Sequence, residues 1–225
     1  MKLLNRFELL PSRPWAGRIG FVVLFLVKAL AVVQPSHAST PQPLVSAEAQ
    51  KRILVDPGAP ILGSAKADVT VVEYFDYNCP FCKTLAPAFH PFIEKDHESA
   101  VLYKEWPIFG GVSTYAAQSA LAAGFQGKYL LAHDALISAP RLAENSQVDS
   151  VLANAGIDLT RLKADLIARR ASIDRLLARN DLEARGLGLH GTPGILVGRR
   201  VVSGISDLRS LQSAVALARH PGADR

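Results

Sequence analysis

The chain has 225 residues, of which 49% are hydrophobic and 20% are charged. This balance excludes an intrinsically disordered protein, because disordered chains combine low hydrophobicity with high net charge. The length suits one domain with room for an elaboration and is sufficient to bury a core. The formal charge is +5, but the sequence shows no basic face that would indicate a nucleic-acid partner.

Residues 1–38 have the pattern of a signal peptide. Basic residues precede an apolar run at 19–33, and small residues then lead to a cleavage position before Ser39. The pattern predicts an exported protein. The alternative is an uncleaved membrane anchor, which Lys28 disfavours because it leaves the apolar run well short of a spanning length. Cleavage would remove five basic residues and one acid, so the formal charge would fall from +5 to +1.

The next segment, 39–66, is predicted to comprise a leader and an edge segment. Residues 39–50 are small and polar and include two prolines, which is typical of a flexible leader. A turn is predicted at 56–60, which reads Asp-Pro-Gly-Ala-Pro. Residues 61–63 are expected to add a short edge strand before the core.

Residues 67–111 form the first part of the predicted core. The stretch 69–75 is rich in β-branched and aromatic side chains and predicts a buried strand. A helix is predicted to follow, with Asn78 as its N-cap and Pro80 in its first turn. Cys79 then lies at the helix N-terminus, where unpaired N–H groups and the helix dipole lower the pKa of a thiol. We therefore expect a reactive thiolate at Cys79.

The two cysteines of the chain, Cys79 and Cys82, admit three interpretations. One helical turn separates them, so they can close a small and readily reduced ring, and the strand-then-helix setting favours a redox-active dithiol. The second interpretation is half of a zinc site, but the spacings of His90 and His97 do not match the usual pattern. The third is an inert structural disulfide, which would constrain the unfolded chain little because its loop is so short.

The segment 100–109 predicts the second core strand, in which Lys104 and Glu105 are interpreted as solvated edge residues. Residues 112–185 have the periodicity of helices and predict a helical insertion. Arginines alternate with aspartates in the later part of this insertion. That alternation indicates a solvated face of mixed charge rather than a partner-binding patch.

The last part of the predicted core is segment 186–220. Hydrophobic residues flank Gly-Arg-Arg within 194–204, which predicts a β-hairpin. Ser206 is predicted to cap a final helix. Such a helix would cover one face of the sheet.

Two stretches of the sequence resemble DsbA-like thiol:disulfide oxidoreductases of the thioredoxin superfamily. Residues 72–82, Val-Glu-Tyr-Phe-Asp-Tyr-Asn-Cys-Pro-Phe-Cys, are similar to the active-site segment of that family. Residues 190–193, His-Gly-Thr-Pro, are similar to the loop in which the superfamily places a cis-proline beside the reactive cysteine. The resemblance covers about residues 56–219. It implies an α/β protein with a thioredoxin fold and a helical domain inserted between the second and third core strands.

The resemblance also implies roles for individual residues. Cys79 would be the attacking cysteine, Cys82 the resolving cysteine, and Glu73 a buried acid behind the pair. Four further residues would complete the site: Pro193 as the cis-proline, and Thr192, Phe81 and Pro80 in substrate binding.

The predicted function is that of an exported enzyme that exchanges disulfides with cysteine-containing exported proteins. A membrane-bound or soluble redox partner would recycle the cysteine pair, and no cofactor, metal or nucleic acid is expected. Oxidation of substrates is the favoured direction, since a stabilised thiolate at Cys79 favours the reduced form. Phe81 stands where the best-known oxidase of the family has His, which indicates a milder oxidant. The alternatives are an isomerase or reductase, or a metal-binding or chaperone module that uses the dithiol as ligands.

Overall fold

The computed structural model describes residues 44–64 and 66–220 of the chain. The predicted signal peptide, 1–38, lies outside these ranges, whereas all residues predicted for the site lie within them. In the described part of the chain no helix is both long enough and apolar enough to cross a membrane.

Five strands of this part form one mixed sheet in the order β1-β3-β2-β4-β5. The two longest strands, β2 and β3, run parallel to each other, and the other neighbouring pairs are antiparallel. A parallel pair needs a crossover connection, which the helices between β2 and β3 provide. The predicted edge strand and hairpin are confirmed. The strands are β1 (Ile61–Gly63), β2 (Val69–Phe75), β3 (Ser99–Glu105), β4 (Gly194–Val197) and β5 (Arg200–Val202).

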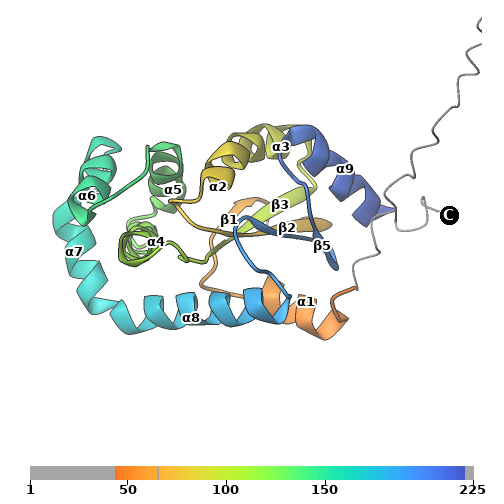
Figure 1. Ribbon diagram of the computed structural model, residues 1–225, viewed down its shortest axis with the longest axis horizontal. Coiled ribbons are helices and arrows are strands. Elements are labelled where there is room, and N and C mark those ends of the chain that lie inside the picture. The colour runs from red at the N-terminus through yellow and green to blue at the C-terminus, as the bar shows by residue number, and fades with distance from the viewer. Residues whose placement is uncertain (1–43, 65, 221–225) are drawn as a thin grey trace, which may run out of the picture. The chain divides into compact units, whose positions relative to one another are not determined.

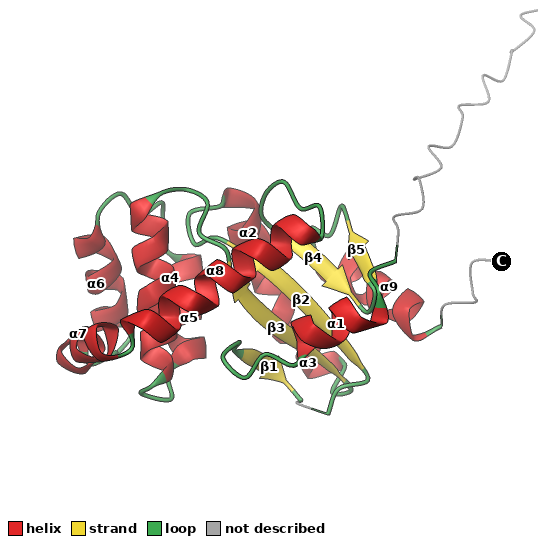
Figure 2. Ribbon diagram, turned by 90° about the horizontal axis from the view of Figure 1, so that it is seen from below, coloured by secondary structure: helices red, strands yellow, loops and turns green. Residues whose placement is uncertain are grey.

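Helices cover both faces of this sheet (Figure 1). Helices α2, α3 and α9 lie on one face, and α1 and α8 cross the other, as Figure 2 shows with these two in front of the strands. Helices α4 to α8 follow β3 and precede β4, so the predicted helical insertion is confirmed. The helices are α1 (Ala47–Leu54), α2 (Pro80–Leu85), a 3₁₀ turn (Ala86–Ala88), α3 (Phe89–Lys95), α4 (Gly111–Gly124), α5 (Tyr129–Ser138), α6 (Asn145–Asn154), α7 (Leu159–Ala168), α8 (Arg170–Gly186) and α9 (Leu208–Arg219).

The alternation of side chains along β2 divides the core into two layers. Val71 and Phe75 point to the layer that also contains both cysteines, whereas Val72 and Tyr74 point to the layer beneath α1 and α8. All four side chains are almost completely buried. Full burial of an apolar side chain of this size contributes roughly 1.5–3 kcal/mol. Strand β2 is therefore the central support of the cysteine segment that follows it.

The prediction of a flexible leader is wrong for residues 44–50. Helix α1 begins at Ala47, and Ser46 caps it by accepting a hydrogen bond from the Ala49 N–H at 3.1 Å. Ile53 anchors the helix, because its side chain is only 4% exposed and packs with the layer of Val72. Packing of this kind gives a short helix most of its stability, so the polar composition of the segment conceals it.

Lys104 and Glu105 are buried, so their interpretation as solvated edge residues is wrong. Their strand, β3, lies between β1 and β2 and therefore has no free edge. The Lys104 Nζ lies 2.8 Å from Asp56 Oδ2 and 2.9 Å from Glu183 Oε2. A buried ammonium group is tolerated there because two carboxylates compensate its lost hydration.

This Lys104 cluster, defined as Lys104, Asp56, Glu183 and Arg179, joins β3 to α8 and to the loop after α1. Arg179 Nη2 lies 2.6 Å from Asp56 Oδ1, and its side chain is 46% exposed, so this arginine lies on the solvated face predicted for it while it also pairs with a buried carboxylate. The hydroxyl of Tyr74, on β2, donates to Glu183 at 3.1 Å. Burial raises the pKa of Asp56, but hydrogen bonds from Lys104 and Arg179 outweigh it and hold the pKa below its usual range.

Candidate active site

The cysteine segment begins where β2 ends, and its N-cap residue is Cys79. The Cys79 Sγ accepts a hydrogen bond from the backbone N–H of Cys82 at 3.4 Å. The prediction of Asn78 as the cap is wrong, because its side chain is engaged elsewhere. Its amide donates to the Leu142 carbonyl at 3.0 Å and accepts from the Leu142 N–H at 2.8 Å. The sulfur atom thus occupies the position that a serine or aspartate side chain commonly fills.

The loop before β4 brings Thr192 and Pro193 beside this sulfur. The Thr192–Pro193 peptide bond is cis, as predicted. In its protonated form, the thiol of Cys79 donates to the Thr192 carbonyl oxygen at 3.1 Å, although 113 residues separate the two. The pairing of β4 with β2 explains this contact, because it aligns the loop before β4 with the segment after β2. The Thr192 Oγ1 is buried and has no hydrogen-bond partner among the described residues.

The two cysteines have opposite acidities. The pKa of Cys79 is lowered to about 6, chiefly because the Cys82 thiol can donate to its sulfur, and also because backbone N–H groups of Cys82 and Phe81 point toward it. These donors outweigh burial, which alone would raise the pKa. The pKa of Cys82 is raised, first by burial and then by its hydrogen bond to Cys79. Both cysteines are free thiols in the structure. Near neutral pH, one thiolate and one thiol therefore lie one helical turn apart.

Glu73 lies inside the protein, as predicted. It points to the same face of β2 as Phe75, is 2% exposed, and has Tyr103 on β3 as its register partner. Burial raises its pKa well above the usual range, and the neighbouring charge at Cys79 raises it further. Glu73 also contributes to the raised pKa of Cys82, which indicates that the two groups are electrostatically coupled.

Asp76 is a buried residue that organises the site and that our sequence analysis missed. Its Oδ1 accepts from the Asn78 N–H and the Ser113 hydroxyl, both at 2.7 Å. Its Oδ2 accepts from the N–H groups of Ile108 and Phe109, at 2.7 and 2.9 Å. One carboxylate therefore holds together the cysteine segment, the loop after β3 and the start of α4. An acidic residue at the end of an apolar strand, directly before the cysteine motif, was the available signal.

A second buried acid, Glu105, lies on the same sheet face as Glu73 and not at the solvated edge predicted for it. Neither of its carboxylate oxygens has a hydrogen-bond partner among the described residues. Burial raises its pKa to about 7. Nearby, the Tyr77 hydroxyl lies 3.2 Å from Nδ1 of His133, whose pKa is lowered to about 3 by burial. Neither thiol is a hydrogen-bond partner of Glu105, Tyr77 or His133 among the described residues.

The residues predicted to bind substrate lie at the surface of this site. Phe81 is 73% exposed, and Pro80 before it is exposed as well. Ile108 and Phe109, which Asp76 holds by their backbone, are also exposed. Exposed aromatic and aliphatic side chains beside a reactive group can bind an apolar polypeptide segment.

The zinc interpretation finds little support in the geometry. His90 Nε2 lies 3.1 Å from both carboxylate oxygens of Asp134, at the surface. In the ranges that the structure describes, no three side chains of His, Cys, Asp or Glu come together in a way that could hold a metal ion.

The acidity of Cys79 gives a first prediction. Its alkylation rate should rise as the pH increases through about 6 and then level off, because only the thiolate reacts. In Cys82→Ala the midpoint should move up toward about 8.5, the ordinary value for a thiol, since the main donor is lost. Cys82→Ser keeps a hydroxyl donor and should shift less. Equal midpoints in these two variants would contradict the assigned cause.

Comparisons with known proteins agree with this geometry. Residues 70–216 match the family model of the DSBA-like thioredoxin domain. The crystal structure of a thioredoxin-like oxidoreductase from Silicibacter pomeroyi DSS-3 is similar, with 36% identity, a TM-score of 0.71, and coverage of 78% of this chain and 98% of that one. The thiol-disulfide exchange protein alpha-DsbA2 from Wolbachia pipientis is also similar, with 26% identity, a TM-score of 0.68, and coverage of 75% and 95%.

One curated relative is much longer than this chain. The Na(+)/H(+) antiporter NhaA 1 from Salinispora arenicola is 29% identical over 162 residues, which are 70% of this chain and 24% of that protein. The chain thus spans about a quarter of the length of the curated relatives that it matches at this extent.

Proposed function

Since this chain belongs to the DSBA-like thioredoxin domain family, we propose that it is a thiol:disulfide oxidoreductase that oxidises cysteine-containing exported proteins. One observation carries the proposal. The Cys79 sulfur caps α2, has a pKa of about 6, and lies 3.1 Å from the Thr192 carbonyl. A stabilised thiolate next to a thiol of high pKa is the arrangement that disulfide exchange requires.

In the oxidising direction, the reaction begins from a Cys79–Cys82 disulfide. A substrate thiolate attacks the sulfur of Cys79, a new S–S bond forms, and the bond to Cys82 breaks. Cys82 leaves with the electron pair and takes up a proton. A second substrate thiolate then attacks the substrate sulfur of the mixed disulfide, so that Cys79 leaves as a thiolate. The substrate loses two electrons and the cysteine pair gains them.

The low pKa of Cys79 favours this direction. Below its ordinary value, each unit of thiol pKa stabilises the reduced form by about 1.4 kcal/mol at a pH above both values. Because the folded-state pKa is the lower one, this stabilisation is complete above about 8.5 and is lost as the pH falls through about 6. Phe81 offers the sulfur neither charge nor a side-chain donor, which supports a milder oxidant than one with His at that position.

The exposed residues around the sulfur are proposed to hold an extended substrate segment. The backbone of Thr192 would pair with the segment as an added strand, because unpaired peptide groups at such a position favour this mode of recognition. Pro80 and Phe81 would contact the side chains of the substrate. Pro193 would fix the loop that presents Thr192.

Glu73 is proposed to exchange a proton with Cys82 during these steps. Replacing it by Gln should slow the steps in which Cys82 gains or loses its proton by roughly a hundredfold, at the lower end of general acid–base contributions, and flatten their pH dependence. These steps are formation of the mixed disulfide in the oxidising direction and its release by Cys82 in the reverse direction. Glu105→Gln is the matched control, because Glu105 is equally buried on the same sheet face but is not coupled to the thiols. Stopped-flow exchange with a dithiol peptide would measure both. Equal effects of the two variants would contradict a specific role for Glu73.

The direction of the chemistry is tested by a redox titration against glutathione together with refolding of a reduced, multi-cysteine protein. The proposal expects net disulfide transfer to the substrate. A potential as low as that of a thioredoxin-type reductant, with no transfer, would assign the protein to the reductases instead. Cys82→Ser should trap the covalent complexes with substrates and with the partner that recycles the pair.

Export is proposed from residues 1–38 and the small residues before Ser39. The periplasm is the proposed compartment, where disulfides persist. N-terminal sequencing of the native protein tests this proposal. A chain beginning near Ser39 supports cleavage, and an intact Met1 in a washed membrane fraction would indicate an anchor.

A further inference from the structure

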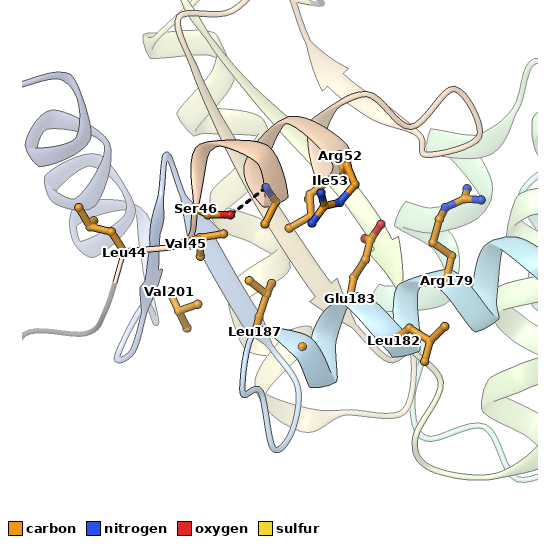
Figure 3. A pocket seen from close by; sticks show the side chains of 12 residues that line it. Leu44, Val45, Ser46, Arg52, Ile53, Arg179, Leu182, Glu183, Leu187 and Val201 are labelled. Carbon is orange, nitrogen blue, oxygen red and sulfur yellow. Dashed lines mark hydrogen bonds between the residues drawn. The ribbon is translucent and has the colours of Figure 1, made fainter.

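A cavity of about 670 Å³ opens on the sheet face opposite the cysteine pair. Its walls come from the segment at α1, from α8 and from β5, as the close-up in Figure 3 shows. The volume falls within the range of about 300–1,000 Å³ that is usual for small-molecule sites. None of the residues placed in the redox site lines it.

The walls of the cavity are mainly apolar. Leu44 and Leu182 line it although they are 51% and 71% exposed. Apolar surface in contact with water costs free energy, which a ligand with an apolar body would recover on binding. Four more apolar side chains contribute to the walls: Val45, Ile53, Leu187 and Val201.

Among the residues that the structure describes, the charged groups of the cavity leave one positive charge without an ion-pair partner. Lys104 neutralises Glu183 at 2.9 Å, and Asp56 neutralises Arg179 at 2.6 Å. Arg52, which lies next to Ile53 on α1 (Figure 3), makes no side-chain hydrogen bond or ion pair with any residue that the structure describes. A guanidinium group beside an apolar cavity favours a carboxylate or another anionic group.

The walls do not suit a peptide. A buried peptide needs partners for its N–H and C=O groups, because an unsatisfied one costs free energy. The hydroxyl of Ser46 already caps α1. The edge of β5 is occupied too, since Leu44 forms a bridge with Arg200 and the Val45 N–H donates to the Arg199 carbonyl at 2.8 Å. The Arg200 end of this edge is therefore already paired with the chain's own backbone.

We propose that this cavity binds a fatty carboxylate, with the carboxylate on Arg52 and the hydrocarbon chain along the apolar walls. The site is separate from the redox centre and needs no cysteine. The ligand is a single-chain amphiphile, because Arg52 is the charged lining residue that makes no ion pair with any residue the structure describes, and the walls beside it are apolar.

Calorimetric titration of the full chain with dodecanoate, below its critical micelle concentration, tests the proposal. Dodecanol and dodecyltrimethylammonium have the same chain with a neutral and a positive head. We expect saturable binding of one dodecanoate and at least roughly tenfold weaker binding of the other two, since a hydrogen bond to a charged group is lost. Arg52→Gln should weaken dodecanoate to the same extent. Lys51→Gln removes an equal charge from the same helix, outside the cavity, and should change little.

A second variant fills the cavity. A Cβ added at Gly186 would meet no atom within 4 Å, and this residue lines the cavity from α8. Gly186→Leu should therefore abolish binding without destabilising the fold, because leucine is a better helix former than glycine. Disulfide exchange should be unchanged. The proposal is overturned if dodecanoate shows no saturable binding, or if dodecanoate, dodecanol and dodecyltrimethylammonium bind with equal affinity. Full affinity for dodecanoate in Gly186→Leu would overturn it as well. So would an apolar peptide that binds more tightly and displaces dodecanoate.

Discussion

Lys104→Met should lower the free energy of unfolding by about 3–5 kcal/mol, the usual cost of breaking a buried ion pair by removing one partner. Methionine fills a similar volume, so the loss comes from charge rather than from a void. Among the described residues, Asp56 would keep Arg179 as a partner, and Glu183 would keep the hydroxyl of Tyr74 alone. Urea unfolding followed by circular dichroism measures the effect.

The control is Lys95→Met, which removes the same charge from the exposed end of α3 and should change the free energy by at most about 0.5 kcal/mol. Adding Glu183→Gln to Lys104→Met should recover part of the loss, because the stranded carboxylate is then neutral. This double variant also provides a folded sample where the single variant is too unstable. If Lys104→Met and Lys95→Met unfold alike, the Lys104 cluster is not a determinant of stability.

Asp76→Asn should impair both stability and catalysis. An amide can accept at one position only, so its NH₂ group would face backbone N–H donors that the carboxylate now satisfies. We expect a loss of about 3 kcal/mol or more, since each hydrogen bond to a charged group contributes roughly 1.5–3 kcal/mol. Disulfide exchange should slow by roughly tenfold or more, because the segment that positions Cys79 loses its anchor. Urea unfolding and stopped-flow exchange, under conditions where the variant is folded, separate the two effects.

Ser113→Ala is the matched control for Asp76. It removes a single donor and leaves the three backbone N–H groups in place. It should therefore cost roughly 1.5–3 kcal/mol, the contribution of one hydrogen bond to a charged group, and leave the exchange rate nearly unchanged. An Asp76→Asn protein that exchanges disulfides at the unaltered rate would show that the carboxylate supports the fold alone.

The parts of the site that lie close together in the sequence could be predicted. Cys79, Cys82 and the strand before them share one local pattern, in which β-branched residues, a loop and a helix start follow one another. Glu73 was expected inside because its strand neighbours are apolar. The position of Pro193 came only from the family resemblance, because no local property of the sequence relates it to a cysteine 114 residues earlier.

The wrong predictions for individual residues have a common physical cause. In each case the residue interacts with a partner that is distant in the sequence. Lys104 looks solvated until Asp56 and Glu183 are brought to it from a loop and a helix. Asn78 is of a residue type that commonly caps helices, but its side chain instead makes two hydrogen bonds with the backbone of Leu142. Local propensity describes what a residue can do alone, and tertiary contacts decide among these possibilities.

The two outermost strands of the sheet are three residues long, whereas β2 and β3 inside it have seven each. A long, unpaired strand edge recruits extended segments from other chains and promotes aggregation. Substrate chains of the kind proposed above would present such segments to this protein. Its edge strands are short, and one of them is already paired with Leu44, so they offer few free peptide groups to which an extended segment of another chain could bind. An extended substrate segment of the kind proposed above would then pair with the backbone of Thr192 beside the reactive sulfur rather than with a sheet edge.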